Sequence, residues 1–139
     1  MSDPFDDVDI ATARREARER AVSLLYEAEM KSETVAAVVD ALPIPPEPLA
    51  GELAVGVEDV ADELDEHITD ALDASWSFER LAVLDRLVLR LGTYELAHRP
   101  SVPVGAVINE AVELAKYFSG PDAGKFVNGV LSTIATRVR

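Results

Sequence analysis

Four arginines gather near the start of the sequence, in the segment "ARREARER" at residues 13–20. A helix turns by about 100° per residue, so Arg14, Arg15 and Arg18 would lie within one sector while Arg20 points elsewhere. Guanidinium groups held this close repel one another unless acids or an anion offset their charge. Arginine is also the side chain whose geometry best matches phosphate. The spacing is therefore typical of a phosphate-binding helix face.

An ordinary explanation competes with this one. Glu16 and Glu19 are interleaved with the arginines and can neutralise them in part through neighbouring pairs on a solvated helix face. Tyr26 would lie beside the same basic patch, where an aromatic ring can contact a partner, stack on a base or simply pack half-buried. From these residues alone, the solvated face is the favoured interpretation and the role of Tyr26 stays open.

A second candidate is the segment "KFVNGVL" at residues 125–131. Helical spacing places Phe126 in an apolar sector and leaves Lys125 and Asn128 on the polar side, where they could contact a phosphate and a base edge or serve as surface residues. Gly129 lies inside the predicted helix, where glycine costs about 1 kcal/mol relative to alanine. Its presence suggests the close approach of another backbone or a ligand, and helix packing is the common cause.

No group of residues predicts catalysis. The segment "INEAVELAK" carries Glu110 and Glu113 without an accompanying histidine, nucleophile or glycine-rich loop, and Glu113 with Lys116 has the spacing of a helix-surface ion pair. The chain has no cysteine, and its two histidines, His67 and His98, are far apart. We therefore expect no enzyme, no cofactor and no metal site.

Charge is unevenly distributed along the 139 residues, whose formal net charge is -13. Residues 1–75 contain 20 Asp and Glu against 5 Lys and Arg, whereas residues 76–139 contain 6 against 8. Overall acidity disfavours non-specific binding to nucleic acid, yet the local potential decides whether a basic patch binds. No apolar run approaches the roughly 20 residues that a bilayer requires, and the acidic start is unlike a signal peptide, so a cytoplasmic location is expected.

Apolar spacing and proline positions predict an all-α fold. Residues 1–9 are acidic and aperiodic, which predicts a mobile tail. A first helix from Ile10 would put the arginines close to its start, and Ser77 is the predicted N-cap of a helix beginning at Phe78. The charge change near residue 75 divides the helices into two subdomains, residues 10–75 and 76–139. The predicted helices cover residues 10–31, 33–42, 47–73, 78–98, 104–118 and 121–139.

Four segments, taken in order, resemble the bacterial transcription antitermination factors of the NusB family. They are "ARREARERAVSLLYEAE", "VLRLGTYEL", "VPVGAVINEAVELAKYF" and "KFVNGVL", and they extend from about Ala13 to Leu131. The resemblance implies a fold of two packed helical bundles with six to seven helices. It also implies a non-catalytic protein that binds the boxA element of ribosomal-RNA leader transcripts together with NusE, a small-subunit ribosomal protein. Other Nus factors and RNA polymerase complete the antitermination complex that supports rRNA synthesis.

The same resemblance assigns roles to residues at matching positions. Glu16 departs from the family pattern, because relatives can carry another arginine there, and it should weaken the attraction of phosphate. The implied RNA contacts are Arg14, Arg15, Arg18, Lys125, Phe126 and Asn128, with Asp122 as a modulator of RNA affinity. The implied NusE-facing residues are Tyr26 and Asp85.

Two alternatives remain at this point. A NusB-like domain can precede the catalytic domain of an rRNA cytosine methyltransferase, but this sequence ends at "ATRVR" without a cofactor-binding region, so we expect no such enzyme. The chain could instead be a protein-interaction module, in which a homodimer interface would cover the arginines. Its acidic stretch at residues 47–73 would then suit a basic partner.

Overall fold

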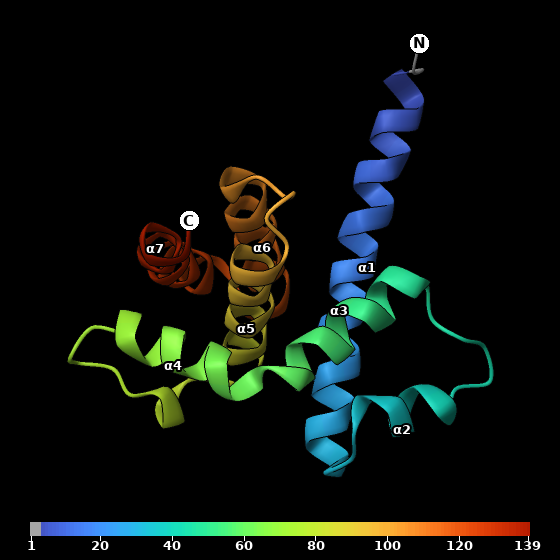
Figure 1. The fold of residues 1–139 in the computed structure, drawn as a ribbon, viewed down its shortest axis with the longest axis horizontal. Helices are drawn as coiled ribbons and strands as arrows, with labels where there is room; N and C mark the ends of the chain where they lie inside the picture. Colours follow the sequence, from blue (N-terminus) through green and yellow to red (C-terminus); the bar gives the residue numbers. More distant parts are fainter. Residues whose placement is uncertain (1–3) are drawn as a thin grey trace. The chain divides into compact units, whose positions relative to one another are not determined.

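The computed structural model describes the backbone of residues 4–139 and the side chains from Ile10 onward. This part of the chain consists of seven α-helices and one 3-10 helix, without a strand. Figure 1 labels the α-helices along the chain. The predicted all-α class and helix number are confirmed. The elements are α1 (Pro4–Lys31), α2 (Val35–Asp40), α3 (Pro48–Asp59), α4 (Ala61–Ala71), the 3-10 helix η1 (Phe78–Arg80), α5 (Val83–His98), α6 (Val104–Ser119) and α7 (Pro121–Val138).

Contacts between residues group the chain into two compact units. The first ends at Val55 and the second is Gly56–Arg139, so the dividing point lies within α3. This grouping differs from the division near residue 75, which rested on charge and stays a prediction. Each unit is described by itself below.

Helix α1 begins earlier than predicted, at Pro4 instead of Ile10. Proline suits the first position of a helix because the amide hydrogen that it lacks would have no partner there. Residues 1–3 of the predicted mobile tail lie outside the described residues. The early start places the arginines in the middle of α1, away from the terminus where the helix dipole would oppose positive charge.

The predicted helix over residues 47–73 is wrong, because the chain forms two helices there. Val60, between α3 and α4, has φ -120° and ψ 24°, outside the helical region. Leu53, Val57, Leu64 and Ile68 are all buried and continue one helical spacing across the break, so the apolar pattern does not reveal it. Helix α4 packs on α5 and α7, which are contacts between residues distant in sequence that the spacing within one segment does not report.

The predicted helix start at Phe78 is also wrong. Ser77 precedes only the single turn of η1, and its side chain makes no capping hydrogen bond. Helix α5 starts at Val83 after Leu81 and Ala82 adopt extended backbone. The guanidinium carbons of Arg86 and Arg90 lie 5.9 and 5.7 Å from the centre of the Phe78 ring. The Phe78 ring therefore packs beneath α5 instead of opening that helix.

The second unit is a helical bundle with a continuous apolar core. Helices α5, α6 and α7 pack against one another, and α5 and α6 lie side by side in Figure 1. Arg90 joins α5 to α4 by donating two hydrogen bonds to Asp65, of 2.7 and 2.8 Å. At the end of the chain, the Arg139 guanidinium donates to the backbone oxygen atoms of Leu96 (2.7 Å), Arg99 (3.0 Å) and Glu95 (3.2 Å), which satisfies the carboxyl end of α5. The largest enclosed aliphatic side chains in the core of the second unit are Leu64, Ile68, Leu87, Leu89, Leu91, Leu96, Leu131 and Ile134.

Two glycines set the approach of α6 and α7. Gly120 joins the two helices with φ 98°, a left-handed conformation that favours glycine. A methyl group on Gly124 would lie 2.9 Å from Cγ of Lys116 and 3.4 Å from Cγ1 of Val112. The missing side chain at Gly124 therefore lets the start of α7 lie close against α6.

Candidate nucleic-acid interface

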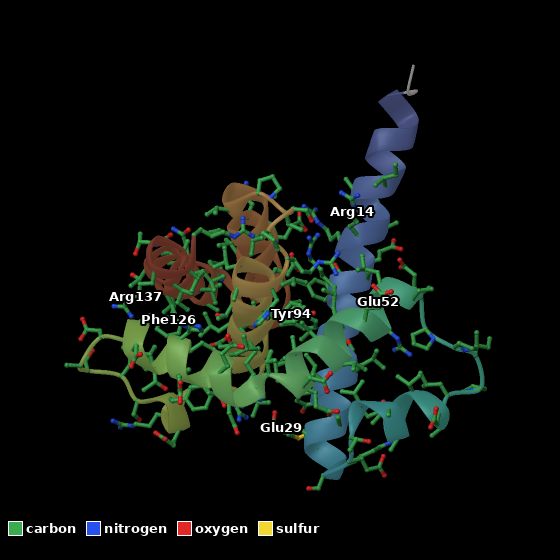
Figure 2. All side chains as sticks on the ribbon, in the orientation of Figure 1. Arg14, Glu29, Glu52, Tyr94, Phe126 and Arg137 are labelled. Carbon is green, nitrogen blue, oxygen red and sulfur yellow. The ribbon has the colours of Figure 1, made fainter. Side chains whose placement is uncertain are left out.

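The arginine segment, residues 13–20 of α1, does not present its basic side chains equally. Arg14 and Arg15 are exposed, and Arg14 is labelled on α1 in Figure 2. Arg18 is only 9 % exposed, although the helical spacing places it in the same sector. Arg20 is exposed on another side of the helix, as its spacing predicts. The surface that can meet a phosphate is consequently that of Arg14 and Arg15, with Glu16 exposed beside them.

The two residues predicted to face NusE differ in exposure. Tyr26 is 41 % exposed on α1. Asp85 lies in the first turn of α5, where an acid is favourable to the helix dipole. It is half-buried, and its Oδ1 atom is enclosed without a hydrogen-bond partner among the described residues. Tyr26 can therefore meet a partner as it lies, whereas Asp85 offers less of its carboxylate.

Helix α7 brings the second set of predicted residues together on its first two turns. Lys125 and Asn128 are exposed, and Asp122 is exposed in the first turn of the same helix. Phe126 is half-buried and points from α7 toward α4 in Figure 2. Lys125 and Asn128 thus offer a charged donor and an amide one helical turn apart, which suits a phosphate and a base edge.

Gly129, next to Asn128, does not serve helix packing. It is exposed, and a methyl group built on it would have no neighbouring atom within 4 Å. The usual explanation for a glycine inside a helix therefore fails at this position. The close approach of a ligand stays a prediction.

The segment between α4 and η1 carries an aromatic residue, Trp76, that is not among the predicted site residues. Trp76 is 50 % exposed there, and its ring centre lies 5.2 Å from that of Phe126 with an angle of 46° between the planes. An open depression of about 450 Å³ beside the ring is lined by Ser75, Trp76 and Arg80. A tryptophan in the polar stretch "DASWSF" is the signal that could have drawn attention to it.

The remaining chemistry of the described residues is structural. Among them, no three His, Asp or Glu side chains are grouped so that they could hold a metal ion. Lys116 and Glu113 form the expected surface pair, with Nζ 3.4 Å from Oε1. None of the helices described is long and apolar enough to cross a bilayer.

An all-α chain with exposed arginines on one helix and a lysine–asparagine pair on another has the features of a nucleic-acid-binding adaptor. Residues 15–136 match the model of the NusB family, and the chain belongs to that family. Among curated relatives, it is 41 % identical to the transcription antitermination protein NusB of Bacillus pumilus, over 87 % of this chain and 93 % of the relative. It is 39 % identical to the NusB protein of Myxococcus xanthus, over 88 % of this chain and 94 % of that one. The chain is thus a non-catalytic transcription antitermination factor, as the resemblance implied.

Solved structures have the same fold. NusB of T. maritima superposes with a TM-score of 0.77 at 35 % identity, covering 88 % of this chain and 90 % of that one. A crystal structure of the antitermination factors NusB and NusE in complex with double-stranded RNA includes a chain that superposes with a TM-score of 0.75. The chain in that complex is 33 % identical to the present protein. The match covers 89 % of the present protein and 96 % of the chain in the complex.

Proposed function

We propose that this protein binds the boxA element of ribosomal-RNA leader transcripts together with NusE. The complex then supports antitermination by RNA polymerase, with other Nus factors, in the cytoplasm. We assign RNA binding to Arg14, Arg15, Lys125, Phe126 and Asn128, with Asp122 as a modulator, and NusE binding to Tyr26 and Asp85. Arg18 belongs to the same predicted set, but it is only 9 % exposed and offers RNA little surface as it lies.

One observation carries the proposal: a match over nearly the full length with a protein solved in complex with NusE and RNA. The match covers 89 % of this chain and 96 % of that one at 33 % identity. Such a likeness extends over most of the fold, and it is too long to leave out either α1 or α7 entirely. It supports a common way of binding more strongly than any single segment does.

The exposed side chains of α1 supply the charge that RNA requires. Arg14 and Arg15 are both exposed, and guanidinium groups can hold phosphate oxygens with two parallel hydrogen bonds. Their number is small and the chain is acidic overall, so non-specific binding should be weak. We therefore assign much of the affinity to the joint binding of RNA by this protein and NusE.

The first turns of α7 supply contacts of another kind. The Lys125 ammonium suits a phosphate, and the Asn128 amide both donates and accepts, as the edge of a base requires. Both side chains are exposed, as is Gly129 beside them. We assign to this surface part of the discrimination between RNA sequences.

A titration of labelled RNA tests the proposal. Fluorescence anisotropy is measured with boxA RNA and with a scrambled RNA of equal length and composition, each with and without NusE. We expect tight binding for boxA with NusE, and weak binding to either RNA by the protein alone. Light scattering at the same concentrations identifies any homodimer. Equal affinity for both RNAs in the presence of NusE would refute the proposal.

A further inference from the structure

Trp76 and Phe126 form an exposed aromatic platform in the second unit of the chain. Trp76 lies between α4 and η1 and is half exposed, while Phe126 comes from α7. Their ring centres are 5.2 Å apart and the ring planes meet at 46°. Phe126 supports one side of the indole, and much of the rest of Trp76 is left to solvent. The exposed part of the Trp76 ring is a rigid amphipathic surface that a partner can contact.

The depression beside Trp76 has a lining that suits a nucleotide. It is open to solvent, with a volume of about 450 Å³, so a flat ring could lie on its surface without being enclosed. The indole of Trp76 offers a face for stacking, and the exposed guanidinium of Arg80 offers charge for a phosphate. Aromatic rings that stack bases beside basic groups that follow the backbone are the means by which proteins bind single-stranded nucleic acid.

Local hydrogen bonds hold the segment in shape. Asp73 Oδ1 accepts from the Ser75 amide at 2.9 Å and from the Ser75 hydroxyl at 3.1 Å. The backbone amide of Trp76 donates to the Asp73 carbonyl oxygen at 2.9 Å, and that of Arg80 to the Ser77 carbonyl oxygen at 3.1 Å. The hydrogen bond from the Ser75 amide is the main reason that the pKa of Asp73 is lowered. Because the turn is already formed, little conformational entropy would be lost on binding.

The platform includes a residue of α7, the helix that also carries Lys125 and Asn128. Phe126 follows Lys125 directly and lies two residues before Asn128, and both of these neighbours are exposed. Residues 76–139 contain 8 Lys and Arg against 6 Asp and Glu, whereas residues 56–75 of the same unit contain 8 Asp and Glu and no Lys or Arg. Attraction of RNA to the platform therefore depends on nearby basic groups such as Arg80 and Lys125, and not on net charge. A strand of RNA on the first turns of α7 could therefore extend over the platform.

We infer that an unpaired base of the bound RNA stacks on Trp76, supported by Phe126, while Arg80 contacts the adjoining phosphate. This inference rests on the proposed function and adds a site to it. RNA is the favoured occupant because a flat aromatic face beside a guanidinium suits a base with its phosphate.

The test uses Trp76 as its own probe, because it is the single tryptophan of the chain. The full chain with NusE is titrated with labelled boxA RNA, and anisotropy of the label and tryptophan emission are recorded together. The W76F complex supplies the background emission of NusE. We expect boxA RNA to quench the emission of Trp76 at the same concentration at which the anisotropy rises.

Substitutions measure the contribution of each group. W76A should weaken boxA binding roughly 5- to 100-fold, the range for loss of one stacked base, and W76F should retain most of the affinity. R80A should weaken binding. It should also make the negative slope of log affinity against log salt shallower by about 0.7. The matched controls are Y117A, which removes another exposed aromatic ring, and R137A, which removes an exposed arginine at the far end of α7. Both controls should bind as the unaltered protein does.

Three results would overturn the inference. If W76A binds boxA normally and RNA leaves the emission unchanged, the stacked base does not exist, although the proposed function stands. If NusE alone quenches Trp76 and W76A loses affinity for NusE only, the platform contacts protein. If the unaltered protein with NusE does not bind boxA, the proposed function and the inference fail together.

Discussion

The arginine segment of α1 and the aromatic platform of Trp76 and Phe126 differ in the contact that they offer to RNA. The arginine segment offers charge, and Glu16 and Glu19 reduce it within the same two turns. The platform offers ring surface, next to the exposed Lys125. Charge attracts any nucleic acid and weakens with salt, whereas stacking requires an unpaired base and depends little on salt. The two regions should therefore be separable by experiment.

The largest effect should come from the exposed arginines. R14A/R15A removes two phosphate contacts and should lower boxA affinity by roughly 10- to 100-fold, at about 1 kcal/mol or more per charged hydrogen bond. Anisotropy with NusE present measures this change. The control R20A/K31A removes the same charge from other exposed positions of α1 and should bind within about twofold of the unaltered protein. Equal losses in both variants would mean that the position of the arginines has no importance.

A smaller effect of opposite sign is expected at Glu16. This exposed acid lies beside Arg15 and departs from the family pattern, so E16A should raise boxA affinity. An exposed charge interaction of about 0.2–1 kcal/mol corresponds to a gain of up to roughly fivefold. The same anisotropy titration at low salt measures it, with E33A as the control on an exposed acid outside α1. An unchanged or lower affinity would remove Glu16 from the account of the arginine segment.

Two glycines of α7 test the other region. Gly129 is open to solvent, so G129A should raise the free energy of unfolding by about 0.5–1 kcal/mol through helix propensity. G124A should lower it, because the added methyl group meets Lys116 and Val112. Denaturant unfolding of both variants measures the difference. If RNA approaches the backbone at Gly129, G129A binds boxA more weakly despite its greater stability; unchanged binding would show that this part of α7 lies away from RNA.

The smallest effect concerns the turn that holds Trp76. The hydrogen bonds from Ser75 lower the pKa of Asp73 below its ordinary value of 3.8. The turn is therefore fully stabilised above that value and loses this stabilisation only as the pH falls through the lower pKa of the folded state. Emission of Trp76 should stay constant from neutral pH down to about 4. D73A, which lacks the acceptor, should show altered emission at neutral pH, and emission equal to that of the unaltered protein would mean that the turn does not need Asp73.

Sequence patterns predicted some elements well because local signals decide them. Prolines and the Ser119–Gly120 turn bound the helix over residues 104–118, and α6 follows it closely as Val104–Ser119. The break at Val60 escaped prediction because no proline or glycine marks it and the apolar spacing continues across it. The burial of Arg18 was missed because spacing reports direction on one helix and not what packs against it. Trp76 was missed because its contact with Phe126 joins residues 50 positions apart in the sequence, a pairing that only the fold creates.

The central claim is that charge on α1 and stacking at Trp76 contribute separately to RNA binding. The most direct test is the slope of log affinity against log salt for boxA RNA, measured with NusE for the unaltered protein, R14A/R15A and W76A. We predict that R14A/R15A reduces the magnitude of this negative slope by about 1.4, the value for two phosphates of a single strand. W76A should weaken binding equally at every salt concentration and leave the slope unchanged. Equal slopes for all three proteins, or an equal decrease in both variants, would contradict the account.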